Sequence, residues 1–107
     1  MQKKSLVGLT ESMFYVLMAF YLGGEKCGTD VAEFIEERSG GLLRMGPATL
    51  YTVLAKFEQE KCIQETAVEG RKRSYRITAK GIQLYREELE RLRQCIADAE
   101  REEGRAQ

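Results

Sequence analysis

The side chains with the clearest chemical potential form a run of cations beside a glycine. Gly70 is followed by Arg71, Lys72 and Arg73, and no acidic residue occurs between Arg71 and Lys80. Three consecutive cations repel one another unless an anion screens them. A phosphate backbone supplies that anion, and each neutralised phosphate also releases counterions. The run predicts a turn that grips phosphates, although an ordinary solvated turn is the alternative.

A second stretch, earlier in the chain, predicts a helix with one polar face. In Gly46-Pro47-Ala48-Thr49-Leu50-Tyr51, Pro47 suits a first helical position, where its missing N–H costs nothing. The apolar residues that follow at helical spacing are Leu50, Val53, Leu54 and Phe57. Small and hydrogen-bonding residues on the opposite arc allow close approach to base edges in a major groove. This arc is predicted to read DNA, and an ordinary solvated face is the alternative.

The composition argues against catalysis. The chain has no histidine, which removes imidazole metal ligands and the commonest general base. Its cysteines, Cys27, Cys62 and Cys95, form no Cys-x-x-Cys pair, and no glycine-rich phosphate loop occurs. We therefore expect no enzyme, no metal site and no cofactor. The cysteines are interpreted as reduced thiols of a cytoplasmic protein, with Cys62 in the core; a redox sensor is the alternative.

The size and charge of the chain suit a single small domain. Its 107 residues include 43% hydrophobic residues and one proline, which is typical of a folded globule. The net charge is zero, but the charges are segregated, with cations after Gly70 and acids gathered between Glu87 and Glu103. Such segregation suits a DNA-binding face with an acidic rear.

The first helix is predicted from its N-cap Thr10 to Leu22. Its apolar run is about half as long as the roughly twenty residues that span a bilayer, so no membrane contact is expected. A helix that is apolar all round must be covered all round, and a small domain covers only one side. A second copy of the chain is the economical cover, through Phe14, Leu17, Met18 and Tyr21.

The last helix is predicted from a cap at Thr78 onward. Apolar residues recur there at steps of three and four, the spacing of a coiled-coil seam. A narrow seam on a long helix projects beyond a small core and favours a second helix, although a solvated tail packed on its own domain is the alternative. The seam residues predicted at a dimer interface are Tyr85, Leu89, Leu92 and Ile96.

Two weakly alternating segments are predicted to pair as a β-hairpin. They are Ile63–Val68 and Ser74–Ile77, with the hairpin tip between them at Glu69–Arg73. Helix, strand, basic turn and strand, in this order, are typical of a winged helix-turn-helix, which reads duplex DNA with the helix and grips phosphates with the wing.

The remaining helix is predicted from Gly28 or Thr29 to Ser39, where two glycines end it. The expected fold is therefore mainly α with a small β-hairpin. A winged helix-turn-helix DNA-binding domain is predicted over residues 1–80, followed by a C-terminal dimerisation helix over residues 81–107.

Together, the cation run and the proline-led helix resemble the PadR family of bacterial transcriptional regulators. Its members share a helix opening on a Pro-x-Thr-Leu-Tyr type run and a Gly-Arg-Arg-Lys-Tyr-Tyr type wing that leads into Leu-Thr-x-x-Gly. Here these motifs stand as Pro47–Tyr51, Gly70–Arg76 and Ile77–Gly81. The resemblance runs from about Leu6 to the end of the chain.

The resemblance implies a homodimeric transcription factor, most often a repressor, that binds a near-palindrome of double-stranded DNA. It places dimerisation on the first and last helices, as in smaller relatives with a single C-terminal helix. Many relatives carry a His-Gly-Tyr type turn where this chain has Cys27-Gly28-Thr29. The DNA contacts that it implies are Thr29, Thr49, Tyr51, Thr52, Lys56, Arg71, Lys72 and Arg73.

Family members also commonly respond to small compounds, which implies a small apolar or aromatic effector. In some relatives a tryptophan of the last helix stacks on a drug between the subunits. This chain has no tryptophan, and Leu92 stands near the matching place. Phe14, Met18 and Tyr85 are the residues expected to line an apolar gap. The competing interpretation of the same fold is a protein-interaction module that does not bind DNA.

Overall fold

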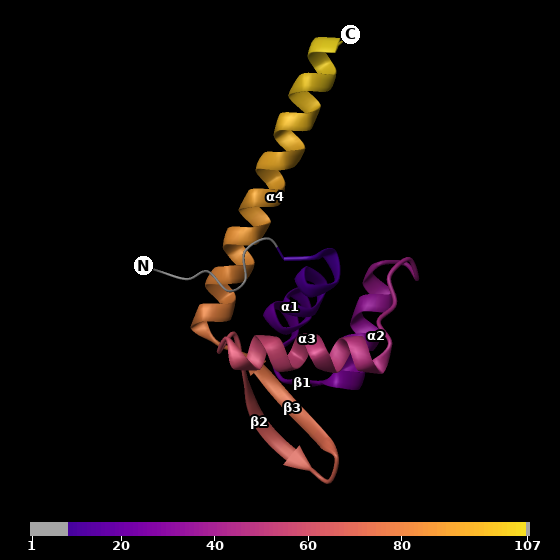
Figure 1. Cartoon of the computed structure of the whole chain (residues 1–107), viewed down its shortest axis with the longest axis vertical. Coiled ribbons are helices and arrows are strands. Elements are labelled where there is room, and N and C mark those ends of the chain that lie inside the picture. The colour runs from indigo at the N-terminus through magenta and orange to yellow at the C-terminus, as the bar shows by residue number, and fades with distance from the viewer. Residues whose placement is uncertain (1–8, 107) are drawn as a thin grey trace.

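The computed structural model describes residues 9–106, so the first eight residues of the predicted DNA-binding domain lie outside it. Four helices and three strands occur in this part of the chain (Figure 1). In chain order they are α1 (Glu11–Gly23), β1 (Lys26–Cys27), α2 (Gly28–Arg38), α3 (Pro47–Gln59), β2 (Ile63–Glu69), β3 (Lys72–Ile77) and α4 (Ala79–Ala106). This is the expected winged helix-turn-helix followed by a long C-terminal helix.

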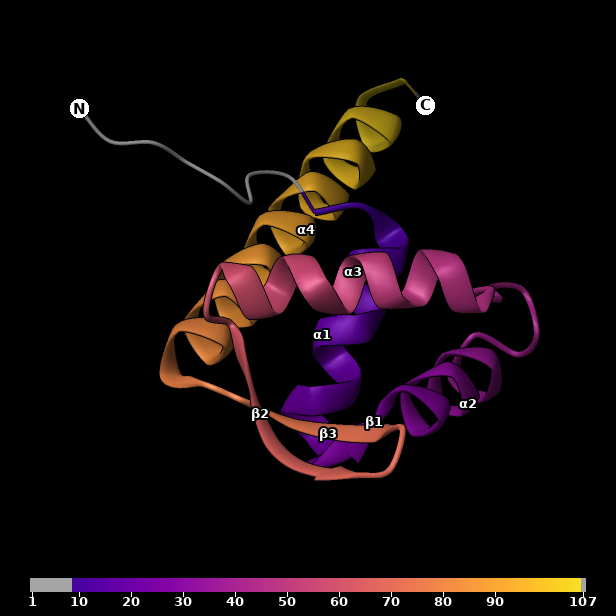
Figure 2. The same cartoon turned by 60° about the horizontal axis from the view of Figure 1, so that its bottom comes forward.

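Helix α1 lies at the centre, in contact with α2, α3, α4 and β3 (Figures 1 and 2). Its residues Val16, Leu17 and Ala19 have no exposed surface, and Phe20 is 1% exposed. The predicted role of Leu17 in a dimer interface is therefore wrong, because the chain's own elements enclose this side chain. Helices α2, α3 and α4 and strand β3 all pack against α1, so its own chain covers more of this helix than the one side that was predicted.

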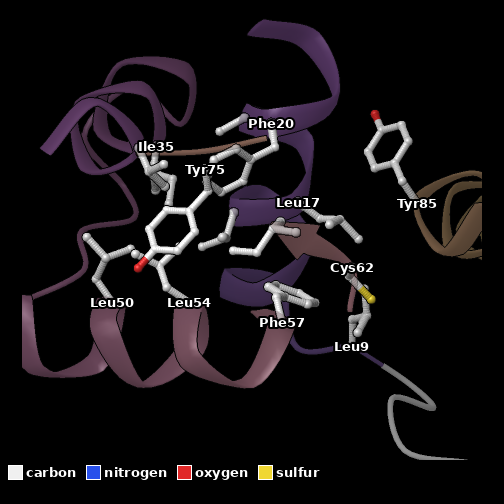
Figure 3. Close-up of a cluster of buried hydrophobic side chains, with 14 residues drawn as sticks. Leu9, Leu17, Phe20, Ile35, Leu50, Leu54, Phe57, Cys62, Tyr75 and Tyr85 are labelled. Carbon is white, nitrogen blue, oxygen red and sulfur yellow. The ribbon is translucent and has the colours of Figure 1, made fainter. Parts of the chain in front are cut away.

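The core that surrounds α1 is drawn from every helix and from the sheet. Figure 3 shows Leu17 and Phe20 of α1 facing side chains of α2, α3 and β3. The ring of Phe20 meets Tyr75 of β3 edge-on, with 6.4 Å between the centroids. Cys62 is fully buried beside Ile63, as predicted, and burial raises the pKa of its thiol.

Local signals set the helix starts as predicted. The Thr10 hydroxyl accepts a hydrogen bond from the Met13 amide at 3.1 Å, which confirms the N-cap of α1. Pro47 opens α3 after Gly46. At α4, the Thr78 hydroxyl accepts from the Gly81 amide at 3.1 Å and donates to the Lys61 carbonyl at 2.7 Å. Thr78 thus caps α4 and also ties it to the turn before β2.

The sheet is antiparallel in the order β1-β3-β2, so β3 lies in the middle. The sequence analysis missed β1, because two residues carry no alternating pattern. The hairpin is also longer than predicted: Glu69 pairs with Lys72, and the tip is Gly70 and Arg71 alone. Gly70 has φ +66°, a conformation that favours glycine.

Helix α4 packs on the domain only through its first half. Tyr85 stacks on Phe14 and Tyr21 of α1, with ring centroids 5.2 Å and 4.3 Å apart. Tyr85 is therefore only 7% exposed within its own chain, which corrects its predicted place in a dimer interface. The second half of α4 projects from one end of the molecule, and the β2–β3 hairpin projects from the other (Figure 1).

Within residues 9–106, no helix combines the length and the apolar character that crossing a membrane requires.

Gly81 sets how closely α4 approaches the sheet. A Cβ atom at this position would overlap the backbone carbonyl of Cys62 and the side chain of Ile77. We expect Gly81→Ala to destabilise the fold by about 1–3 kcal/mol, because a buried backbone contact must move apart. Urea unfolding at equal protein concentrations measures this loss.

Gly104→Ala is the matched control on the same helix. Nothing lies within 4 Å of a Cβ at position 104, so this variant should match or exceed the wild-type stability. Equal stability of the two variants would show that the contact between Gly81 and Cys62 does not constrain the fold.

Candidate nucleic-acid interface

Helix α3 separates a buried face from an exposed one. Leu50, Leu54 and Phe57 are at most 3% exposed and point into the core (Figure 3). The predicted DNA-contacting residues Thr49, Tyr51, Thr52 and Lys56 are all exposed. The Thr52 hydroxyl donates to the Ala48 carbonyl at 2.9 Å and keeps its acceptor capacity. The polar face is therefore available to a large partner.

A groove of about 740 Å³ lies between the N-terminus of α2, one flank of α3 and the hairpin. It brings together five predicted DNA-contacting residues from three separate segments: Thr29, Tyr51, Arg71, Lys72 and Arg73. Thr49, Thr52 and Lys56 do not line it. Thr49 and Lys56 are seven residues apart, about two helical turns, and so share the other flank of α3. The predicted residues thus form two adjoining surfaces.

Tyr51 joins α3 to the start of α2. A Cβ atom at Gly28 would lie 2.9 Å from the Tyr51 hydroxyl and 3.0 Å from its ring, so the phenol rests on the glycine backbone. Tyr51 remains 53% exposed on its other side. A residue larger than glycine at position 28 would push this ring toward the groove.

The turn before α2 is fixed by the Asp30 carboxylate. The Cys27 amide and thiol both donate to one carboxylate oxygen of Asp30, at 3.2 Å and 3.3 Å. The amide hydrogen bond is the main cause that lowers the pKa of Asp30. This cap holds the turn that presents Thr29 at the wall of the groove. Cys27 is itself buried and pairs with Ser74 in the sheet.

The three consecutive cations at the tip of the wing, Arg71, Lys72 and Arg73, differ in their surroundings. Arg73 forms an ion pair with Glu65 of β2, with 3.5 Å between its Nε and the carboxylate Oε2. Within residues 9–106, no ion pair involves Arg71 or Lys72. Both are exposed near the hairpin tip. Of these three cations, Arg71 and Lys72 are therefore the two that form no ion pair with a carboxylate of the described chain.

Sequence reasoning missed two acidic residues of the groove, Asp30 and Glu58. Glu58 lies seven residues after Tyr51, so both occupy the same flank of α3. This spacing could have revealed Glu58. The place of Asp30 could not be found in this way, because it depends on how α2 packs beside the wing.

The sequence profile of the Transcriptional regulator PadR-like family matches residues 16–87, which include α2, α3 and both strands of the hairpin. The chain belongs to this family. No curated protein matches the chain significantly.

Solved structures share the fold of this PadR-like chain. A transcriptional regulator from Clostridium thermocellum superposes with a TM-score of 0.74 at 23% identity, over 84% of this chain and 87% of the other. H. salinarum RosR gives 0.69 at 17% identity, over 89% and 96%. Bacillus subtilis PadR in complex with operator DNA gives 0.66 at 22% identity, over 77% of this chain and 48% of that one.

Arg71→Ala is expected to weaken binding to every DNA sequence alike. Loss of one phosphate contact should reduce the slope of log K against log salt by about 0.9, because one fewer counterion is released. Fluorescence anisotropy with a labelled duplex across a salt series measures the slope. Arg101→Ala removes the same side chain from the projecting half of α4, far from the groove, and should leave the slope unchanged. Equal slopes for both variants would exclude Arg71 from phosphate contact.

Proposed function

We propose that this PadR-like regulator binds specific double-stranded DNA as a homodimer and acts as a repressor. The supporting observation is the convergence of the polar face of α3, the start of α2 and the cationic hairpin on one side of the domain. Helix α3 would enter a major groove while the wing contacts the flanking phosphates. The bound protein would block transcription by occupying an operator in the cytoplasm.

Base reading is assigned to the exposed face of α3, and phosphate binding to the wing. Thr49, Thr52 and Lys56 provide donors and acceptors on the outer flank of α3. Tyr51 lies between this flank and the groove and is held against Gly28. Thr29, Arg71 and Lys72 would position the domain on the backbone, since phosphate contacts carry no sequence information directly.

The homodimer is supported by apolar surface that the chain itself does not cover. Ile96 is 58% exposed on the projecting half of α4, and Leu92 and Leu89 precede it on the same seam. On α1, the side chains of Phe14, Met18 and Tyr21 are only partly buried. A second copy seated on α4 would cover these residues and place two α3 helices on one duplex. Leu17 and Tyr85 are not part of this interface, because the chain already buries them.

Ile96→Asp tests the interface without touching the core of the domain. A carboxylate in the seam would be desolvated beside apolar partners, so we expect monomers in light scattering at micromolar concentration. Gln94→Asp places the same side chain on the opposite face of α4 and should leave a dimer. A dimer in the Ile96→Asp variant would exclude the α4 seam.

The test of function is selection from a randomised duplex library at near-physiological salt. An enriched inverted repeat, with half-sites about one helical turn apart, is expected of a dimer with two winged domains. Thr49→Ala should then relax the preference at one position of each half-site, by about 1–3 kcal/mol. Retention without an enriched motif would contradict sequence-specific regulation. No salt-dependent retention would favour a protein-interaction module.

An apolar or aromatic effector is the final part of the proposal. Phe14 and Met18 of α1 are half-buried, and Phe14 stacks on Tyr85 of α4, so a second subunit seated there would enclose them. A ligand there would change DNA binding only if it favoured one arrangement of the two subunits. The structure of Bordetella bronchiseptica BpsR, at 22% identity and a TM-score of 0.67 over 84% of this chain and 59% of that one, concerns regulation of its DNA binding by 6-hydroxynicotinic acid.

A further inference from the structure

The side chain of Arg73 leaves β3 on the opposite face from that of Lys72, its neighbour in the strand. Successive side chains of a strand point to opposite faces, so Arg73 shares a face with Tyr75 and Ile77. Tyr75 is 5% exposed and packs into the core against α1, which identifies this face as the inner one. Arg73 therefore extends along the inner face of the wing toward α3 and not outward from the tip.

The inner face presents a carboxylate to Arg73. Glu65 of β2 lies across the hairpin, with its Oε2 atom 3.5 Å from the Arg73 Nε. This oxygen is buried and has no hydrogen-bond partner in the described part of the chain. The contact with Arg73 is thus an ion pair without hydrogen-bond alignment. Among the ion pairs within residues 9–106, it is the one that engages a wing cation.

A second carboxylate faces Arg73 from α3. Glu58 and Arg73 line the same groove, and Glu58 and Glu65 line one hollow of about 430 Å³ between the end of α3 and β2. A hydrogen bond from Arg73 to the Tyr75 phenol, and the charges of Glu65 and Glu58, raise the pKa of Arg73. Two elements therefore surround one cation with negative charge.

The ion pair is weak enough to open. The Arg73 side chain is 58% exposed and that of Glu65 32% exposed. Pairs with this exposure contribute about 0–1 kcal/mol, because water and salt screen them. A DNA phosphate can compete with Glu65 for the guanidinium, but the freed carboxylate then remains beside the phosphate and repels it. The pair thus reduces what Arg73 contributes to DNA affinity.

We propose that Glu65, supported by Glu58, is a positioning residue that restrains Arg73 and limits the sequence-independent affinity of the wing for DNA. The proposal rests on the DNA binding proposed above. In the DNA-free protein the charges of Arg71 and Lys72 are available to attract a duplex. The charge of Arg73 is instead paired with Glu65 on the inner face of the wing. Because of this restraint, the wing makes fewer effective phosphate contacts than it has cations.

Glu65→Gln tests the restraint, since it removes the charge and keeps the shape of the side chain. Binding to a labelled random-sequence duplex should tighten roughly two- to five-fold, the equivalent of up to about 1 kcal/mol. The salt slope should steepen by about 0.9, because Arg73 then neutralises one more phosphate. Glu58→Gln should change both quantities in the same direction but less, since Glu58 forms no direct ion pair with Arg73.

Three further variants separate restraint of Arg73 from general charge repulsion. Glu69→Gln removes an equal charge from the same strand, outside the ion pair, and should have a smaller effect than Glu65→Gln. Arg73→Ala should alter the salt slope little, and Glu65→Gln added to Arg73→Ala should give a smaller gain than Glu65→Gln alone, without a steeper salt slope, because only the repulsion by the Glu65 carboxylate is then relieved. Circular dichroism melting checks that each variant is folded before binding is compared.

The outcomes distinguish this proposal from the proposed function. Salt-dependent binding by the wild type, with a gain for Glu65→Gln that is smaller without Arg73 and a steeper salt slope that is lost without it, supports the restraint. A gain of equal size in the Arg73→Ala background, or no gain at all, overturns it and leaves DNA binding intact. Absence of wild-type binding to any duplex would overturn the proposed function, and the restraint with it.

Discussion

The positions of the other helices and of the sheet depend on one interaction, the burial of the apolar helix α1 by the rest of its own chain. Helices α2, α3 and α4 and strand β3 all contact this one apolar helix, and Val16, Leu17 and Ala19 are completely buried by them. Burial of such side chains contributes about 1.5–3 kcal/mol each for the larger ones. Because α3 and β3 pack on the same central helix, the polar face of α3 and the wing are held at a fixed spacing. That spacing is what a duplex would meet.

Two glycines then set distances that side chains would prevent. Gly28 lets the Tyr51 ring rest on the backbone at the start of α2, and Gly81 lets α4 approach the carbonyl of Cys62. The contact at Gly28 brings α3 against the start of α2 beside the groove. The contact at Gly81 fixes the direction in which α4 leaves the domain. The candidate interface for DNA and the proposed dimer seam of α4 therefore lie toward opposite ends of the molecule (Figure 1).

Charge on the wing is organised by strand geometry as well as by composition. The alternation of β3 sends Arg73 inward to Glu65, whereas Arg71 and Lys72 stand near the tip. All three adjacent cations are exposed, but only Arg73 forms an ion pair with a carboxylate of the described chain. Asp30 and Glu58, which line the groove, and Glu65, which pairs with Arg73, make the groove less positive than the run of cations alone would suggest.

The sequence by itself determined the elements whose signals are local: the Thr10 cap, the Pro47 start of α3, the buried stripe of α3 and the glycine turn of the wing. Periodicity and capping act over a few residues, so they can be read without the fold. The sequence could not show that α1 is enclosed by its own chain, that Tyr85 stacks within the monomer, or that β1 exists as a third strand. It also could not pair Arg73 with Glu65 or bring Asp30 to the groove. Those features arise from contacts between segments far apart in the chain, and only the packing of helices and sheet around α1 decides them.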